Sequence, residues 1–196
     1  MIENADVVRV LNSKRDNAAI VSTMTANNAH LGLPSVTSNE KLDFPLSGCM
    51  SKASSVALGL ALARPERKVM VLDGDGSLLM NLGTLVTIGG EAPDNLYHIV
   101  LDNGMYAMTG GQPVPNAGNI DYSGLAGAAG YTKTFEFDDL EEWTTRIGEV
   151  LDERGPVLIV MKTAPEITDW VANPPKPSRR MPEAVPIARA AMTGQS

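Results

Sequence analysis

Two apolar runs that each end in a polar tip constrain the fold of this chain more than any other feature. The first run, Lys68 to Leu72, is followed by Asp73-Gly74-Asp75-Gly76-Ser77, and the second, Leu96 to Leu101, is followed by Asp102-Asn103-Gly104. Short apolar runs bounded by turn residues are typical of buried strands. Between them, Leu78 to Ile88 has the length and the apolar spacing of a helix. The pattern therefore predicts a strand, a tight glycine turn, a helix and a second strand.

A strand, helix and strand in this order form a crossover between parallel strands, which brings both tips to the same carboxyl edge of one sheet. Further buried strands are predicted at Ala18 to Thr23, Thr132 to Phe137 and Pro156 to Lys162. Helices are predicted at residues 2–14, 51–63, 121–130 and 138–155. We therefore predict an α/β fold, with a doubly wound, mainly parallel sheet and helices on both faces. Such sheets bind ligands at their carboxyl edge.

The two tips carry side chains suited to a cation and a phosphate. Asp75 offers an anionic oxygen and Asn103 a neutral carbonyl oxygen, both of which are ligands that hard divalent cations prefer. Ser77 is expected to open a helix, whose N-terminal amides favour anions. A divalent cation that bridges the protein to a diphosphate fits this set best. The simpler alternative is that Gly-Asp-Gly is only a turn and that the aspartate caps a helix.

Asn103 follows Asp75 by 28 residues, and this arrangement resembles the Gly-Asp-Gly and asparagine motif of the thiamine diphosphate (ThDP) enzymes. The stretch is similar to their diphosphate-binding domain. The resemblance implies that Mg²⁺ is held by the side chains of Asp75 and Asn103 and by the carbonyl of Met105. It also implies a cofactor-binding turn made of Gly74, Gly76 and Ser77. Many members have asparagine where this chain has Asp102. The difference keeps the implied metal ligand, Asn103, and changes only the residue before it.

A second segment, Gly48-Cys49-Met50-Ser51, resembles the turn that holds the aminopyrimidine ring in ThDP enzymes. The resemblance implies that the Gly48 carbonyl accepts a hydrogen bond from the cofactor and that Met50 wedges between its two rings, with Cys49 also in the cofactor-binding segment. A flexible thioether suits that place, although an apolar residue in a turn is more often part of the core. Ser51 stands where the family commonly has a second glycine. Cys49 is not expected to be a nucleophile, because only Lys52 is near enough in sequence to lower the pKa of its thiol.

The segment from Asn103 to Asn119 contains four glycines and two prolines, and a loop of this length in a compact domain is usually functional. Its sequence, GMYAMTGGQP, resembles the corresponding segment of the small 2-oxoacid decarboxylases that act on sulfopyruvate and phosphonopyruvate. The resemblance extends over residues 44–165. It implies that Tyr106 lies over the cofactor, with Thr109, Gly110, Gly111 and Gln112 near the substrate. Alternatively, Tyr106 only covers the strand end.

Two histidines are present. His30 lies in a polar loop from Met24 to Asp43, which leaves the same predicted edge of the sheet. It is either a group that transfers protons or binds the substrate anion, since histidine titrates near neutral pH, or a solvated loop residue. His98 lies inside a predicted strand, where a packed residue hydrogen-bonded to a neighbour is expected.

Composition narrows the class of partner. The net charge of −7 and a pI near 4.8 argue against nucleic acid and against an anionic membrane surface. No apolar run approaches a membrane span and no signal-peptide pattern opens the chain, so we expect a cytoplasmic protein. A single cysteine, Cys49, excludes an internal disulfide and a cysteine-ligated iron–sulfur cluster.

We expect one ThDP-binding domain over residues 1–165 and an extended, proline-rich tail over residues 166–196. The tail contains Arg179-Arg180, which we interpret as a solvated pair. A sulfonate or phosphonate group on a substrate needs cationic or amide donors. No arginine lies in the predicted site segments, and Lys52 is the only lysine near them.

The resemblance also implies a second polypeptide. In the family, ThDP is activated by a glutamate from a pyrimidine-binding domain, and 196 residues leave no length for such a domain. We therefore expect a subunit of a heteromeric 2-oxoacid decarboxylase that acts on a small 2-oxo acid and releases CO₂ and an aldehyde. Its partner would be an α-type subunit that supplies the glutamate, in a hetero-oligomer built on dimers. The alternatives are a carboligase or acyl-transfer subunit, and a module that binds ThDP without turnover.

Overall fold

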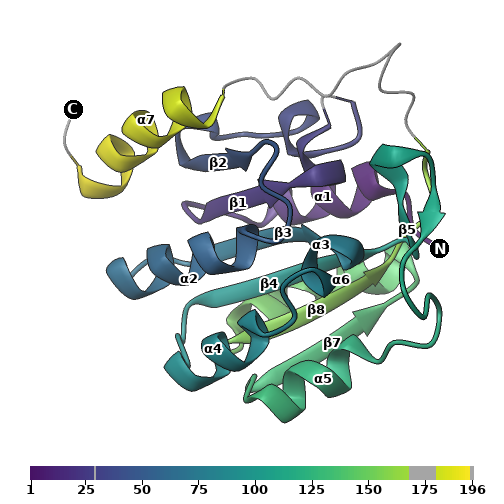
Figure 1. Cartoon of the computed structure of the whole chain (residues 1–196). Helices are drawn as coiled ribbons and strands as arrows, with labels where there is room; N and C mark the ends of the chain where they lie inside the picture. The colour runs from purple at the N-terminus through teal and green to yellow at the C-terminus, as the bar shows by residue number, and fades with distance from the viewer. Residues whose placement is uncertain (29, 168–179, 195–196) are drawn as a thin grey trace.

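A six-stranded sheet forms the centre of the structure (Figure 1). The computed structural model describes residues 1–28, 30–167 and 180–194. The strand order is β2-β1-β3-β4-β8-β7, and every neighbouring pair is parallel. The strands are β1 (Ala19–Thr23), β2 (Asp43–Leu46), β3 (Val69–Gly74), β4 (Leu96–Asp102), β7 (Lys133–Phe137) and β8 (Val157–Lys162). The predicted fold class is confirmed.

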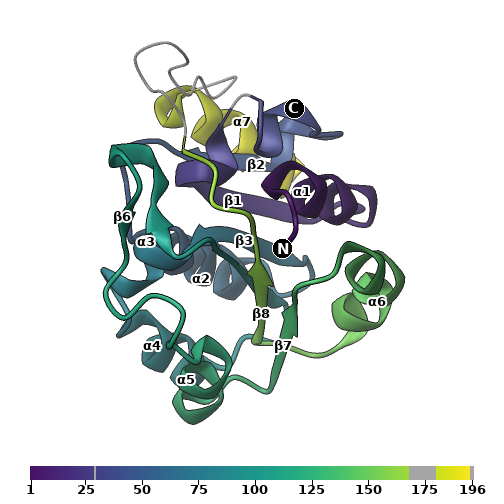
Figure 2. The ribbon, with the colours of Figure 1, turned by 90° about the vertical axis from the view of Figure 1, so that its right-hand side faces the viewer.

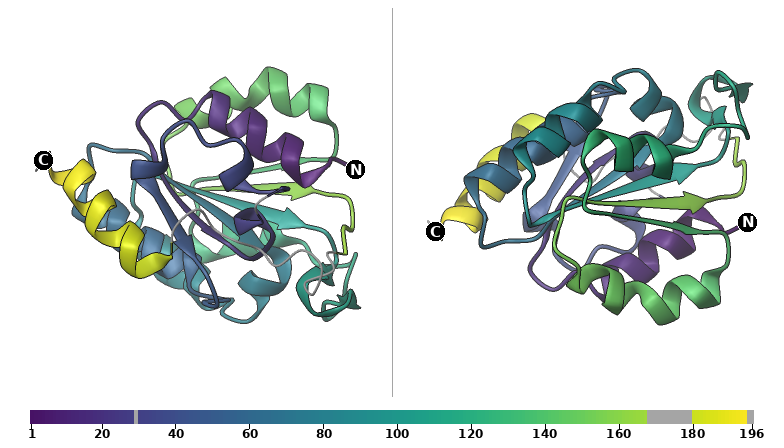
Figure 3. Two further views of the ribbon diagram at one scale, coloured as in Figure 1. Left: turned by 90° about the horizontal axis from the view of Figure 1, so that it is seen from above. Right: turned by 90° about the horizontal axis from the view of Figure 1, so that it is seen from below.

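Helices cover both faces of this sheet (Figure 3). One face carries α1 (Asn4–Ser13) and α6 (Leu140–Asp152). The opposite face carries α2 (Ala53–Ala63), α4 (Thr84–Glu91), α5 (Tyr122–Ala129) and α7 (Met181–Thr193). Successive residues of β3 alternate between the two layers, with Val71 in the α2 layer and Met70 in the α1 layer. The strands are apolar throughout because both faces of the sheet are covered.

The helix predicted from Leu78 to Ile88 is interrupted. The chain instead forms α3 (Asp75–Leu79), a turn, and then α4 from Thr84. The turn contains Asn81 and Gly83, residue types that favour turns over helix interiors. The Asn81 side chain donates to the Ser51 carbonyl at 3.2 Å, so the interruption connects this crossover to the segment before α2.

The prediction of an extended tail is wrong for its C-terminal part. Residues 181–193 form α7, in which Ala184, Ala188 and Met192 are buried. These residues are four apart and form one apolar face, which packs against β2 and the helical turn Glu40–Leu42. Tail residues 168–179 and 195–196 lie outside the described residues.

The glycine-rich segment after β4 is partly ordered as a ribbon. Strands β5 (Met105–Tyr106) and β6 (Gln112–Pro113) pair in the antiparallel direction. Strand β5 contacts α3, and Figure 2 shows β6 and α3 on the same side of the molecule. Among the described residues, no helix has both the length and the apolar character that crossing a membrane requires.

A buried ion pair attaches the start of β2 to the end of α1. The side chain of Arg15 is 1% exposed, and its Nη1 donates to Asp43 Oδ1 at 2.6 Å and to Thr37 Oγ1 at 3.1 Å. Thr37 in turn donates to Asp43 Oδ2 at 2.6 Å. Strand β2 leads directly into the Gly48–Ser51 segment, so this pair fixes the strand that carries part of the predicted site.

We expect Asp43→Ala to lower the free energy of unfolding by about 3 kcal/mol, because it leaves the Arg15 guanidinium buried without its carboxylate. The matched control is Asp94→Ala, which removes an exposed carboxylate paired with Arg154 and should change stability by less than about 1 kcal/mol. Urea unfolding of the three proteins measures both values. Equal effects of the two substitutions would show that the buried pair does not hold β2.

Candidate functional site

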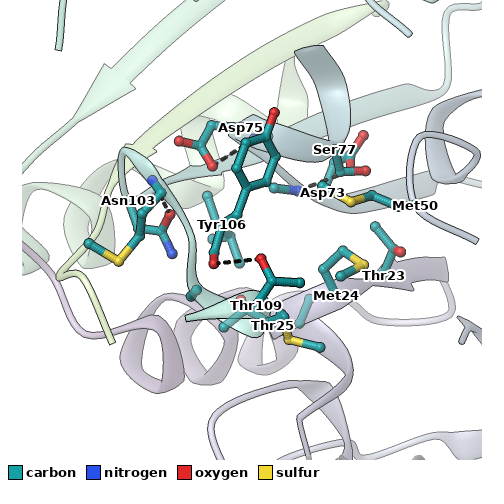
Figure 4. Close-up of a pocket in the computed structure, with 17 residues that line it drawn as sticks. Thr23, Met24, Thr25, Met50, Asp73, Asp75, Ser77, Asn103, Tyr106 and Thr109 are labelled. Atoms are coloured by element: carbon teal, nitrogen blue, oxygen red, sulfur yellow. Dashed lines mark hydrogen bonds between the residues drawn. The ribbon is translucent and has the colours of Figure 1, made fainter. Parts of the chain in front are cut away.

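The carboxyl ends of β1, β3 and β4 meet around one small cavity (Figure 4). Its volume is about 50 Å³, which is far below the roughly 300–1,000 Å³ typical of a complete small-molecule site. The lining residues are Thr23, Met24, Thr25, Ala26, Met50, Asp73, Gly74, Asp75, Gly76, Ser77, Leu101, Asn103, Met105, Tyr106, Ala107, Met108 and Thr109. The connections that follow β1 and β3 run to opposite sides of the sheet, so the cavity lies at the topological switch point, where open α/β sheets bind ligands.

The two polar tips are joined by a hydrogen bond. Asp75 is 2% exposed, and its Oδ2 accepts from the main-chain N–H of Gly104 at 2.8 Å while its Oδ1 accepts from that of Gly76 at 2.8 Å. Burial raises the pKa of Asp75 to about 7, and the neighbouring Asp102 carboxylate adds to the rise, against the two hydrogen bonds. Two carboxylates this close to each other favour a cation between or beside them.

Asn103 and Asp102 face different surroundings. The Asn103 side-chain oxygen accepts from the Met105 N–H at 3.1 Å, and Asn103 lines the cavity. Asp102 accepts instead from Lys162 Nζ at 2.7 Å. Among the described residues, no three His, Cys, Asp or Glu side chains cluster as a metal site. The oxygens of Asp75, Asn103 and the Met105 main chain are hard donors that suit Mg²⁺ better than zinc or iron.

Tyr106 lies directly against the glycine turn. A methyl group at Gly76 would come within 2.5 Å of Tyr106 Cε1, so the close approach of the ring requires glycine at this position. The Tyr106 carbonyl accepts from the N–H of Gly111 at 3.1 Å. Gly110 and Gly111 have φ angles of 109° and 80°, a region that favours glycine. The ribbon therefore places the aromatic ring over the turn.

The Gly48–Ser51 turn is fastened to α3. Ser77 Oγ accepts from the Ser51 N–H at 2.9 Å, and Asn81 donates to the Ser51 carbonyl. Ser51 has a φ of 74°, which glycine adopts more easily. Figure 4 shows Met50 across the cavity from Asn103. The sequence-predicted residues Met50, Asp75 and Asn103 are thus brought together.

Two predicted residues are not brought to the cavity. The Cys49 side chain is half-buried and packs against the α2 layer, because successive residues of the turn point in different directions. Neither Cys49 nor His30 is among the described residues that line the cavity. His30 is exposed, and its main-chain N–H donates to the Asn28 side chain at 2.8 Å, as in the solvated-loop alternative.

His98 has the structural role expected of it. It is fully buried in β4, and its Nδ1 is hydrogen-bonded to Tyr131 Oη at 3.1 Å. Its Nε2 lies 3.5 Å from Asp73 Oδ2. Burial, with a smaller effect of Asp73, raises the pKa of Tyr131 well above its ordinary value. The polar cluster therefore lies inside the α2 layer, beneath the cavity.

A second, larger cavity adjoins the first. Its volume is about 650 Å³. It is lined by Met24, Asn27, Leu46, Ser47, Gly48, Met50, Met108, Thr109, Arg180, Met181 and Pro182. Arg180 is exposed, as the sequence predicts, but its place in the lining of this cavity is not predicted. The spacing of four between Ala184, Ala188 and Met192 is the signal in the sequence, since it is typical of one apolar face of a helix.

An α/β domain with carboxylate, amide and main-chain groups at its switch point is a cofactor-binding domain in its architecture. Residues 21–161 match the family model of the thiamine pyrophosphate enzymes, C-terminal TPP-binding domain. The chain therefore belongs to the thiamine pyrophosphate enzyme family, as the sequence resemblance predicted.

Individual relatives agree with this family. The chain is 36% identical over 170 residues to a phosphonopyruvate decarboxylase of Streptomyces viridochromogenes, covering 87% of this chain and 42% of that protein. It is 38% identical over 141 residues to a sulfopyruvate decarboxylase subunit beta of Methanocaldococcus jannaschii, covering 70% and 74% of the two chains. It thus spans about two fifths of the phosphonopyruvate decarboxylase and three quarters of the beta subunit.

A solved structure shares the fold. Benzoylformate decarboxylase from Polynucleobacter necessarius superposes with a TM-score of 0.68 at 21% identity, covering 83% of this chain and 33% of that one. At this identity the likeness establishes the fold alone. The match confirms that the parallel sheet and its two helical layers are those of a known domain architecture.

We expect Gly76→Ala to destabilise the fold by about 1–2 kcal/mol, because the new methyl group overlaps the Tyr106 ring and displaces it. The same substitution in a Tyr106→Ala background should cost much less, so a double-mutant cycle of unfolding free energies reports the contact. Gly90→Ala is the control, since nothing lies within 4 Å of its added methyl in α4 and alanine favours helices. Additive costs for Gly76 and Tyr106 would contradict the packing of the ring on the turn.

Proposed function

We propose that this chain is the cofactor-binding subunit of a heteromeric, ThDP-dependent 2-oxoacid decarboxylase of the sulfopyruvate or phosphonopyruvate type. The names of its relatives support the reaction. The observation that carries most weight is the contact between the tips, in which Gly104 N–H donates to Asp75 Oδ2 at 2.8 Å. It places a buried carboxylate and the Asn103 amide at one small cavity, as a metal-chelated diphosphate requires.

In this proposal the chain holds Mg²⁺ through the Asp75 carboxylate, the Asn103 side-chain oxygen and the Met105 carbonyl. Mg²⁺ takes about six oxygen ligands and keeps some of them from phosphate and water, so three protein oxygens leave room for a diphosphate. The positive charge of Mg²⁺ beside Asp75 would also lower the pKa of that carboxyl group, and so offset the rise that Asp102 causes. Gly76 and Ser77 line the same cavity, and the Ser77 N–H at the start of α3 would bind a phosphate oxygen.

The remaining residues orient the reacting parts. ThDP, when bound, supplies a nucleophilic carbon and an electron sink, so that the bond from the 2-oxo carbon to the carboxylate breaks with release of CO₂ and, after protonation, an aldehyde. Met50 lines both cavities and would separate the cofactor rings, with the Gly48 carbonyl as a hydrogen-bond acceptor. Tyr106 would cover the cofactor and exclude water. His30 would take part only if the partner brought it to the site.

The partner is an α-type subunit with a pyrimidine-binding domain, in a hetero-oligomer built on dimers. Three lines support it: the beta-subunit name of relatives at 38% and 41% identity, the small volume of the first cavity, and the absence of glutamate from both cavity linings among the described residues. The activating glutamate would come from that partner.

Calorimetry of ThDP binding in the presence of Mg²⁺ tests the ligand assignment. We expect Asp75→Ala to weaken Mg²⁺-dependent binding by more than about 100-fold, because a direct ligand matters more than the outer groups whose loss costs about 10–100-fold. Asp94→Ala, just before the amino end of β4 and so at the end of the sheet away from the cavity, should bind ThDP as the wild type does. Unchanged affinity in Asp75→Ala would refute the metal site.

The assembly is tested by CO₂ release. The chain alone should release no CO₂ from sulfopyruvate or phosphonopyruvate, because the activating glutamate is absent, and mixing with a companion that contains a pyrimidine-binding domain should restore release. A companion in which that glutamate is replaced by glutamine is the control. Acyloin formation in place of CO₂ and a free aldehyde would favour a carboligase. Binding of ThDP without any turnover in the complex would favour a non-catalytic module.

A further inference from the structure

The second cavity has one charged side chain in its lining, and that side chain comes from the C-terminal helix. Arg180 directly precedes α7 and lines the cavity together with Ser47, Gly48, Met50 and Thr109. All the other described residues that line this cavity are uncharged. The chain carries a net charge of −7, yet the charge that the described residues bring to this lining is positive.

Arg180 is held in place through its main chain. Its N–H donates to Glu183 Oε2 at 3.2 Å, and its carbonyl accepts from the N–H groups of Glu183 and Ala184 at 2.9 Å each. The buried Ala188 then fixes α7 on the α2 layer. Among the described residues, no carboxylate forms an ion pair with the Arg180 guanidinium. The backbone is therefore fixed, while the guanidinium donors stay available to a ligand.

The two cavities meet at shared residues. Met24, Met50, Met108 and Thr109 line both of them. A molecule whose reacting carbon lies at Met50 can therefore extend into the larger cavity toward Arg180. The volume there, about 650 Å³, is ample for a small acid.

We propose that Arg180 binds the distal anionic group of the substrate, a 2-oxo acid that ends in a sulfonate or phosphonate, and so selects dianionic over monoanionic 2-oxo acids. The proposal rests on the proposed function for the 2-oxo part. A guanidinium presents a planar fork of donors that matches such oxyanions and keeps its charge at all working pH values. It supplies the cation that the predicted site segments lack, because the exposed Lys52 does not line the cavity. Arg180 also lies outside residues 21–161, the part that matches the family.

Binding of an unreactive ligand tests this assignment without turnover. The probe is 3-sulfopropanoate, which carries a carboxylate and a sulfonate but no 2-oxo group, measured by calorimetry on the complex with its companion subunit and ThDP. We expect Arg180→Met to weaken binding by at least about tenfold, since a hydrogen bond to a charged group is lost. Arg180→Lys should bind with intermediate affinity. Arg189→Met, on an exposed position of the same helix, should leave the affinity for 3-sulfopropanoate unchanged. The affinity for butanoate, which lacks the sulfonate, should be the same in the wild type and in every variant.

Steady-state kinetics give the second readout. Arg180→Met should raise KM for sulfopyruvate at least about tenfold with little change in kcat, and should not affect 2-oxopentanoate. Equal affinity of wild type and Arg180→Met for the sulfonate, no binding to the wild type, or equal losses for both ligands would overturn the proposal. Arg180-dependent binding of the sulfonate without CO₂ release would instead support the anion site and refute the decarboxylase function.

Discussion

The hydrogen bond from the Gly104 N–H to Asp75 is the contact on which the site depends. It joins the turn after β3 to the turn after β4 and buries a carboxylate between them. Asp102 lies close enough to raise the pKa of Asp75 further, beyond the effect of burial. The charged form of Asp75 is therefore held at a free-energy cost that a divalent cation would offset. A site of this kind is arranged for a ligand before the ligand arrives.

The fold was predictable where local pattern and burial agree. Strands β3, β4 and β8 are buried on both faces, so their continuous apolar runs were sufficient signals. Strand β2 was missed because Pro45 lies within it, and proline argues against a central strand. The structure places β2 at the edge of the sheet, where proline is tolerated. The break before Thr84 was also missed, because apolar spacing continues through the turn while Asn81 bonds to a distant segment.

The site was predictable only where its residues follow strands. Asp75 and Asn103 end neighbouring parallel strands, and that topology alone brings them to one edge. The contact of Ser77 with Ser51 crosses 26 residues, and nothing local indicates it. The residue type of Cys49 does not indicate which way its side chain points, and the structure packs that side chain against the α2 layer. Arg180 was the least predictable, since its place depends on how α7 packs against β2.

The position of α7 separates the proposed substrate-binding residue, Arg180, from the strand tips to which we assign the cofactor. The strand tips and the Gly48–Ser51 turn are cross-linked by hydrogen bonds and buried side chains, so a substitution among them disturbs several contacts at once. Helix α7 is attached by a narrow face of mostly small residues, of which Ala184 and Ala188 are examples, to the edge of the sheet. The residue before that helix can therefore change without moving Asp75 or Met50. If the proposed roles hold, a chain built in this way can alter the anionic group that it selects while the proposed metal and diphosphate site stays as it is, because the two tasks are carried by elements that share a cavity wall but few contacts.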